Sequence, residues 1–206
     1  KLIKIGDCPV DVALNKMHSV IPCENEQYFK SQLHYYFRFP EILKSLNITS
    51  SSNSVELTYH KDGSEKKIII TARNCPGYEW YDGLFLPKGW VDAYENFNKP
   101  ASALWLKEPG KLRYFQYLKE SKTIYVRHTA VVEREDELID EFFEKVFHFA
   151  DSIGADKFVL DIRMNSGGNN YLNKSVITGI IKSKIINRYG HFFVIIGAAT
   201  FSAAQN

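Results

Sequence analysis

The segment that most constrains the fold is a short apolar run followed by a pair of adjacent glycines. Phe158 to Ile162 is mostly apolar, which is typical of a strand buried on both faces of a parallel sheet. Gly167 and Gly168 come soon after it, and glycine adopts positive φ angles that other residues avoid. Because no side chain covers the N–H groups of such a turn, the turn can bind an anion or a polarised carbonyl oxygen.

A serine follows the next apolar run along the chain. His191 to Ile196 forms this second run, and Gly197 ends it. Ser202 then lies among small residues, just beyond the expected end of a strand. A turn rich in N–H donors and a serine after a strand are two parts that an acyl-transfer enzyme needs. The alternative interpretation is a serine that ends a strand or caps a helix.

The order of predicted elements indicates an α/β fold with a parallel sheet. Strands and helices alternate in the second half of the chain, at 123–132, 139–153, 158–162, 171–184 and 191–196, and a further strand at 113–118 pairs with the first of them. Such a series builds a parallel sheet through right-handed crossovers. Ligands of these sheets gather beyond the carboxyl ends of the strands. We therefore expect the glycine pair and the serine to converge at one edge.

The first module is expected to span 1–71 and to combine a small sheet with helices. A strand at 2–5, a helix after Pro9, an aromatic helical face within 24–39 and a short helix from Pro40 come first. A hairpin then closes the module around Asp62-Gly63, a dipeptide that favours tight turns.

A loop-rich connector is expected at 72–112, because proline and glycine recur throughout it. Its aromatic residues either pack on the core or line a substrate cleft, and we favour packing. They are Trp80, Tyr81, Phe85 and Trp90. The remaining residues, 113–206, contain the parallel sheet described above.

Composition excludes several classes of protein. The 26 basic and 24 acidic residues are interspersed and give a net charge of +2, so nothing indicates a nucleic-acid partner. Three cysteines are too few for a disulfide framework or a zinc site, and no pair of histidines has metal-ligand spacing. We therefore expect neither a metal nor another cofactor. No apolar run reaches the length of a membrane span, so we expect no integral membrane segment.

Two motifs in this chain resemble those of a known peptidase family. Asp161-Ile-Arg-x-Asn-x-Gly-Gly168 resembles the Asp-Leu-Arg-x-Asn-x-Gly-Gly signature of the C-terminal processing, or tail-specific, serine peptidases. Thr200-Phe-Ser-Ala-Ala resembles the nucleophile segment of that family. The resemblance is strong over 123–206 and weaker over 1–71. It implies a crotonase-like α/β protease core, preceded by the later half of a PDZ-like module that carries a helical insertion.

The resemblance also implies roles for individual residues. Ser202 falls on the position of the nucleophile. The backbone N–H groups of Gly167 or Gly168 and of Ala203 fall on the positions of the oxyanion hole. The substrate would be a peptide or a protein, and the family favours a secreted or cell-envelope location.

Three polar residues of the signature are expected to support the glycine turn. Asp161 and Arg163 lie two residues apart on a strand, so they face the same side and can form an ion pair. Asn165 can bond to the backbone in an Asx-turn. We therefore predict that these residues hold the turn and do not react.

The general base is the part that the motifs do not supply. In the resembling family it is usually a lysine that follows the serine, which here would lie beyond Asn206. The chain begins within a predicted strand and ends within a predicted helix, so we expect it to be a piece of a longer protein and inactive by itself. His128 is the alternative base, as some relatives such as the tricorn proteases use an upstream histidine.

Two other functions remain open from the sequence. The retinoid-binding relatives of this family indicate that the same architecture can hold an apolar ligand, or a peptide, without catalysis. A crotonase-like acyl-CoA enzyme would also use glycine N–H groups, but it would not need Ser202. A base after the serine favours the peptidase, whereas the lack of any base favours the binding module.

Overall fold

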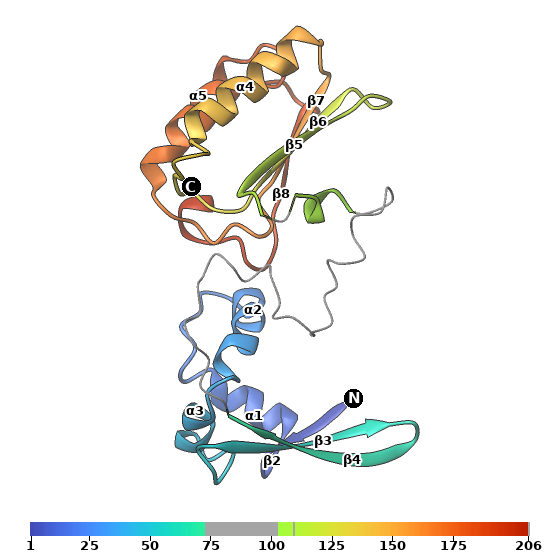
Figure 1. Cartoon of the computed structure of the whole chain (residues 1–206), viewed down its shortest axis with the longest axis vertical. Helices are drawn as coiled ribbons and strands as arrows, with labels where there is room; N and C mark the ends of the chain where they lie inside the picture. The colour runs from blue at the N-terminus through green and yellow to red at the C-terminus, as the bar shows by residue number, and fades with distance from the viewer. Residues whose placement is uncertain (73–102, 109, 206) are drawn as a thin grey trace. The chain divides into compact units, whose positions relative to one another are not determined.

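The computed structural model describes residues 1–72, 103–108 and 110–205 (Figure 1). Over these residues the protein is mixed α/β, with two four-stranded sheets and five α-helices. It divides into two compact units, Lys1–Tyr78 and Glu79–Asn206. The predicted α/β class is therefore confirmed. The connector aromatics, from Trp80 to Trp90, lie outside the described residues.

The first unit is built on an antiparallel sheet with the strand order β2-β1-β3-β4. Its strands are β1 (Leu2–Ile5), β2 (Cys8–Pro9), β3 (Ser54–Lys61) and β4 (Ser64–Thr71). β3 and β4 form the predicted hairpin. Asp62 and Gly63 have φ angles of 55° and 74°. Both angles lie in the left-handed region that a type I′ turn requires, which is why this dipeptide closes the hairpin.

The helices of the first unit are α1 (Val10–Met17), α2 (Glu26–Tyr36) and α3 (Pro40–Ser45). Pro9 belongs to β2 and is the N-cap of α1. The helix predicted within 24–39 begins at Glu26, because the Asn25 side chain accepts the N–H groups of Gln27 and Tyr28 at 3.0 and 2.9 Å. The aromatic face of α2 contributes buried Phe29 to the core, whose other fully buried members include Met17, Leu43 and Ile48.

The second unit contains the predicted parallel sheet. Its strands are β5 (Arg113–Leu118), β6 (Thr123–His128), β7 (Lys157–Asp161) and β8 (Phe192–Ile195), in the order β5-β6-β7-β8. β5 pairs antiparallel with β6, whereas β6, β7 and β8 are parallel. Asp161 pairs with Ile195, so the carboxyl ends of β7 and β8 are adjacent. The loops that follow these two strands must therefore leave the sheet side by side.

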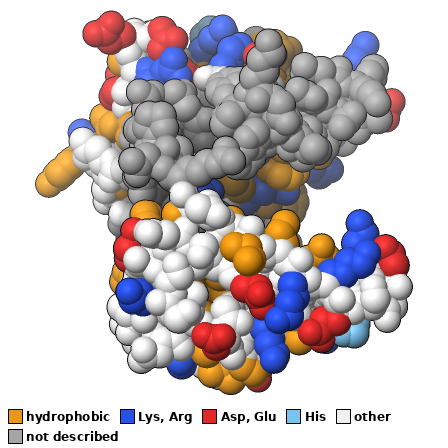
Figure 2. Space-filling model, turned by 60° about the horizontal axis from the view of Figure 1, so that its bottom comes forward, with side chains coloured by type: hydrophobic (Ala, Val, Ile, Leu, Met, Phe, Trp, Pro, Cys, Tyr) orange, Lys and Arg blue, Asp and Glu red, His pale blue; other side chains and the backbone are white. Residues whose placement is uncertain are grey.

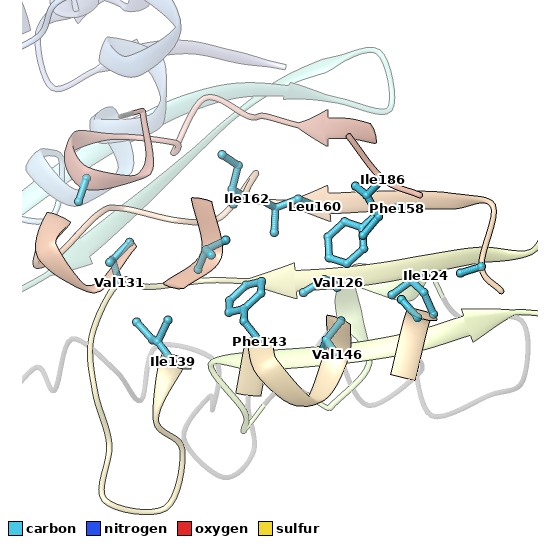
Figure 3. Close-up of a cluster of buried hydrophobic side chains, with 14 residues drawn as sticks. Ile124, Val126, Val131, Ile139, Phe143, Val146, Phe158, Leu160, Ile162 and Ile186 are labelled. Atoms are coloured by element: carbon cyan, nitrogen blue, oxygen red, sulfur yellow. The ribbon is translucent and has the colours of Figure 1, made fainter. Parts of the chain in front are cut away.

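Two helices, α4 (Ile139–Ser152) and α5 (Lys174–Lys182), pack on one face of this sheet. The core between them and the strands is mainly apolar and includes Ile124, Val126, Phe143, Val146, Phe158 and Leu160 (Figure 3). An acidic segment, 133–137, precedes α4. The Glu133 carboxylate accepts the N–H of Ile139 at 2.9 Å and so satisfies a donor of the first turn.

The strand predicted at 123–132 is shorter than expected, since β6 ends at His128. The backbone beyond it has other partners. Asn165 Nδ2 donates to the His128 carbonyl at 3.0 Å, and Val131 pairs with Gly168 in an isolated parallel bridge. The end of β6 is thereby tied to the glycine turn that follows β7.

The helix predicted at 171–184 is also interrupted. It consists of a 3-10 turn, η3 (Asn170–Asn173), followed by α5, because the Asn169 side chain accepts the N–H of Tyr171 at 3.1 Å and caps the turn. Two more 3-10 turns matter for the site, η2 (Leu104–Leu106) and η4 (Ser202–Ala204).

The surface carries charges of both signs. Figure 2 shows acidic and basic side chains interspersed on one face of the molecule, in keeping with the net charge of +2. Within the described part of the chain, no helix has the length and apolar character needed to cross a bilayer.

Candidate active site

The loops that follow β7 and β8 come into close contact at Gly167 and Ser202. A β carbon added to Gly167 would lie 2.6 Å from the β carbon of Ser202 and 2.8 Å from the Phe201 carbonyl oxygen. Gly167 also has a φ of +98°, so both space and backbone conformation require glycine there. The predicted convergence of the glycine pair and the serine is confirmed.

Ser202 has an unusual backbone conformation for a serine. It begins η4 with a φ of 53°, in the left-handed region that non-glycine residues rarely occupy. Such a residue persists only when its surroundings hold it there, and such residues cluster at functional sites. Its side chain is exposed, and no hydrogen bond among the described residues involves its Oγ atom. The hydroxyl is therefore open to a reactant.

The turn that carries Ser202 is fixed by hydrogen bonds to the loop after β7. The Phe201 N–H donates to the Asn165 carbonyl at 3.0 Å. The Thr200 hydroxyl donates to the Ile162 carbonyl at 2.8 Å and accepts the Gly197 N–H at 2.9 Å. Thr200 is buried, so these bonds are shielded from water.

Asn165 connects three segments of the site. It is fully buried, and its Nδ2 atom donates to the His128 carbonyl at the end of β6. Its Oδ1 atom accepts the Gly167 N–H at 2.9 Å, which is the predicted Asx-turn. Because the Gly167 N–H already donates to Asn165, it is not available to an oxyanion. Of the two glycines predicted as donors, Gly168 therefore remains.

Two backbone N–H groups beside the serine have no acceptor among the described residues. They belong to Gly168 and Ala203. The Ser202 carbonyl accepts the Gln205 N–H at 2.8 Å, and in a trans peptide the N–H of the next residue points the opposite way. The Ala203 N–H shares a peptide plane with the Ser202 carbonyl, so the bond from Gln205 also fixes the orientation of this N–H group. A β carbon on Gly168 would lie 2.1 Å from the Val131 carbonyl oxygen, so this position also requires glycine.

Asp161 and Arg163 form the ion pair that the sequence suggested. Arg163 Nε and Nη2 lie 2.9 and 2.8 Å from the two carboxylate oxygens of Asp161, which is buried. The Tyr125 hydroxyl donates to the same carboxylate at 2.6 Å. Burial, with a further contribution from Asp161, raises the pKa of Tyr125 far above its ordinary value. The Arg163 guanidinium also lies over the Trp105 ring, 5.5 Å from its centroid. These contacts connect the start of the loop after β7 to β6 and to η2.

His128 lies in the core and makes no hydrogen bond to Ser202. Its ring packs edge-on against Phe143, with 5.5 Å between the ring centroids, and neither ring nitrogen has a hydrogen-bond partner among the described residues. Burial, and secondarily the charge of Arg113, lowers the pKa of His128 to about 3. A histidine in this setting is a weak base, so the geometry does not favour it as the proton acceptor for the serine.

Sequence reasoning missed the contact that joins the serine turn to η3. Asn173 Nδ2 donates to the Ala203 carbonyl at 2.7 Å. The sequence signal for this contact is weak, because it consists of one poor helix former, Asn173, near the start of a segment predicted to be helical. Among the described residues, no group of three or more histidine, cysteine and acidic side chains could hold a metal ion.

Comparisons with known proteins add no family. No family model matches the chain, and a search of curated proteins finds no match either.

Proposed function

We propose that this chain carries the nucleophile and oxyanion hole of a serine peptidase of the tail-specific type. The observation that carries the proposal is the setting of Ser202. This residue is exposed, it has a positive φ, and the free N–H groups of Gly168 and Ala203 lie in the segments that converge on it. A structural serine that capped a helix would instead use its hydroxyl as a hydrogen-bond acceptor for the backbone.

The chemistry follows from these groups. The Oγ atom of Ser202 attacks the carbonyl carbon of a peptide bond, and negative charge develops on the carbonyl oxygen. The N–H groups of Gly168 and Ala203 stabilise that oxygen, and each such donor lowers a barrier by about 3–4 kcal/mol. A base takes the hydroxyl proton and returns it to the leaving amine. The resembling family supplies a lysine after the serine for this step. Asp161, Arg163 and Asn165 hold the loop and do not react.

The finer fold assignment belongs to the same proposal. Three parallel strands with α4 and α5 on one face are compatible with a crotonase-like core. The order β1, β2, α1 in the first unit is compatible with the later half of a PDZ-like module. Such modules bind peptide ends, which agrees with a peptide or protein substrate.

A fluorophosphonate probe tests the proposal, since it reacts only with an activated serine. The probe is applied to the longest natural form of the protein, to residues 1–206, and to Ser202→Ala. Ser166→Ala is the matched control, because Ser166 is an exposed serine in the neighbouring turn. We expect labelling of the longest form that Ser202→Ala abolishes and Ser166→Ala leaves unchanged.

The other outcomes separate the remaining hypotheses. If residues 1–206 are labelled as well as the longest form, the base lies within these residues, and His128 becomes the candidate for it. A folded long form that is not labelled would overturn the proposal and favour a binding module.

A further inference from the structure

The two N–H groups assigned to the oxyanion hole come from different loops. Gly168 lies in the turn after β7, whereas Ala203 lies in η4 after β8. Two donors stabilise one oxygen only if the distance between them is set to within a fraction of an ångström. The Phe201–Asn165 and Thr200–Ile162 hydrogen bonds hold the start of the serine turn against the loop after β7. A contact that also holds η4 itself would fix the separation of the two donors more closely.

The glycine turn continues directly into a rigid segment. The Asn169 N–H donates to the Val131 carbonyl at 2.8 Å, which fixes the turn to the end of β6. The Asn169 side chain then caps η3. η3 ends at Asn173, so this residue is connected to Gly168 by a short run of capped and hydrogen-bonded backbone.

Asn173 reaches from this segment to the serine turn. Its Nδ2 atom donates to the Ala203 carbonyl at 2.7 Å and to the Asn170 Oδ1 atom at 3.2 Å. With two acceptors, the amide orientation is set, because only the NH2 end can donate to both. η4 has three residues and two backbone hydrogen bonds of its own, from Ala204 N–H to the Phe201 carbonyl and from Gln205 N–H to the Ser202 carbonyl. The bond from Asn173 adds an anchor from outside the turn.

We propose that Asn173 is a positioning residue that sets the separation of the Gly168 and Ala203 donors by linking η3 to η4. The inference rests on the proposed serine chemistry. Asn173 does not touch the substrate, and it acts through the Ala203 carbonyl that it holds. The active serine is thereby coupled to the segment that follows the glycine turn as well as to the turn itself.

The test compares rates of fluorophosphonate labelling in the longest natural form of the protein. Asn173→Ala removes the donor, and Asn173→Asp removes it with almost no change in size. Asn187→Ala is the matched control, because its amide also donates to a backbone carbonyl, that of Ile181 at 3.0 Å, away from the serine turn. We expect both Asn173 variants to react about 10- to 100-fold more slowly, and the control to react as the wild type does.

A second measurement distinguishes positioning from a general loss of structure. In the labelled wild-type protein, the amide proton signals of Gly168 and Ala203 are expected to move downfield, since both donate to the phosphonyl oxygen. In labelled Asn173→Asp, the Ala203 shift is expected to shrink while the thermal unfolding midpoint stays close to that of the wild type. If Asn173→Ala does not fold, the positioning role is tested with Asn173→Asp alone.

The outcomes separate this inference from the function on which it rests. Labelling of the wild type together with equally fast labelling of Asn173→Asp would overturn the positioning role and leave the serine chemistry intact. Absence of labelling in the wild type would overturn both.

Discussion

The burial of His128 predicts a specific dependence of stability on pH. Its pKa is lowered to about 3 in the folded protein, against an ordinary value of 6.5, and its ring is in contact with Phe143 and close to the charge of Arg113. Between these two pKa values the unfolded chain binds a proton that the folded chain does not. The free energy of unfolding therefore falls as the pH drops below 6.5. Above pH 6.5, His128 is neutral in both states and does not change the free energy of unfolding.

The magnitude follows from the two pKa values. Each pH unit in this window corresponds to about 1.4 kcal/mol of unfolding free energy. At pH 5 the difference from 6.5 is 1.5 units, so His128 lowers the stability of the folded state by about 2 kcal/mol relative to neutral pH. The side chain is almost fully buried, so screening by solvent reduces this effect little.

The measurement compares the wild type with His128→Phe, which keeps an aromatic ring against Phe143 and cannot be protonated. Urea unfolding is followed by tryptophan fluorescence at about pH 7.5 and about pH 5. Trp105 lies in η2 of the second unit, so this signal includes the unfolding of that unit. We expect the wild type to lose about 2 kcal/mol more than the variant between these pH values. Because other titrating groups are common to both proteins, equal losses would refute the reasoning.

Two further predictions concern glycines that the structure places against backbone. Gly167→Ala is expected to abolish fluorophosphonate labelling of the long form. The new methyl carbon would lie 2.6 Å from the β carbon of Ser202 and would displace the serine turn. Retained labelling would show that the close contact is not required. Gly6→Ala would bring a β carbon to 2.3 Å from the Ile48 carbonyl oxygen at a φ of +57° and is expected to lower the unfolding free energy of the first unit by about 3 kcal/mol or more. Gly63→Ala is its control, since that position also has a positive φ but open space around it, and it is expected to lose only about 1 kcal/mol. Both variants are compared by urea unfolding followed by circular dichroism, because residues 1–78 contain no tryptophan. Equal losses would mean that backbone strain alone explains both.

Most elements of the fold could be predicted from local patterns. The hairpin around Asp62-Gly63 and the parallel strands β6, β7 and β8 agree with the sequence, because side-chain periodicity and turn residues specify them within a few positions. The errors are at element ends. β6 stops at His128 because Asn165, distant in the sequence, takes the carbonyl that would have continued the ladder.

The candidate site, like the fold, could be predicted from the sequence only in part. Motif spacing was enough to bring Gly167 and Ser202 to one edge of the sheet, since both follow parallel strands that proved to be neighbours. It could not say which glycine keeps a free N–H group. That depended on the Asn165 side chain, whose rotamer directs Oδ1 to Gly167.

The sequence by itself determined the alternation of strands and helices, the positions that need glycine, and the serine that follows a strand. These features depend on residues that are close together in the chain, and their physics is local. Only the tertiary structure decided that His128 is packed in the core and that Asn173 holds the Ala203 carbonyl. Burial and hydrogen bonding between distant segments depend on how the elements pack, and a pattern of neighbouring residues does not specify that packing.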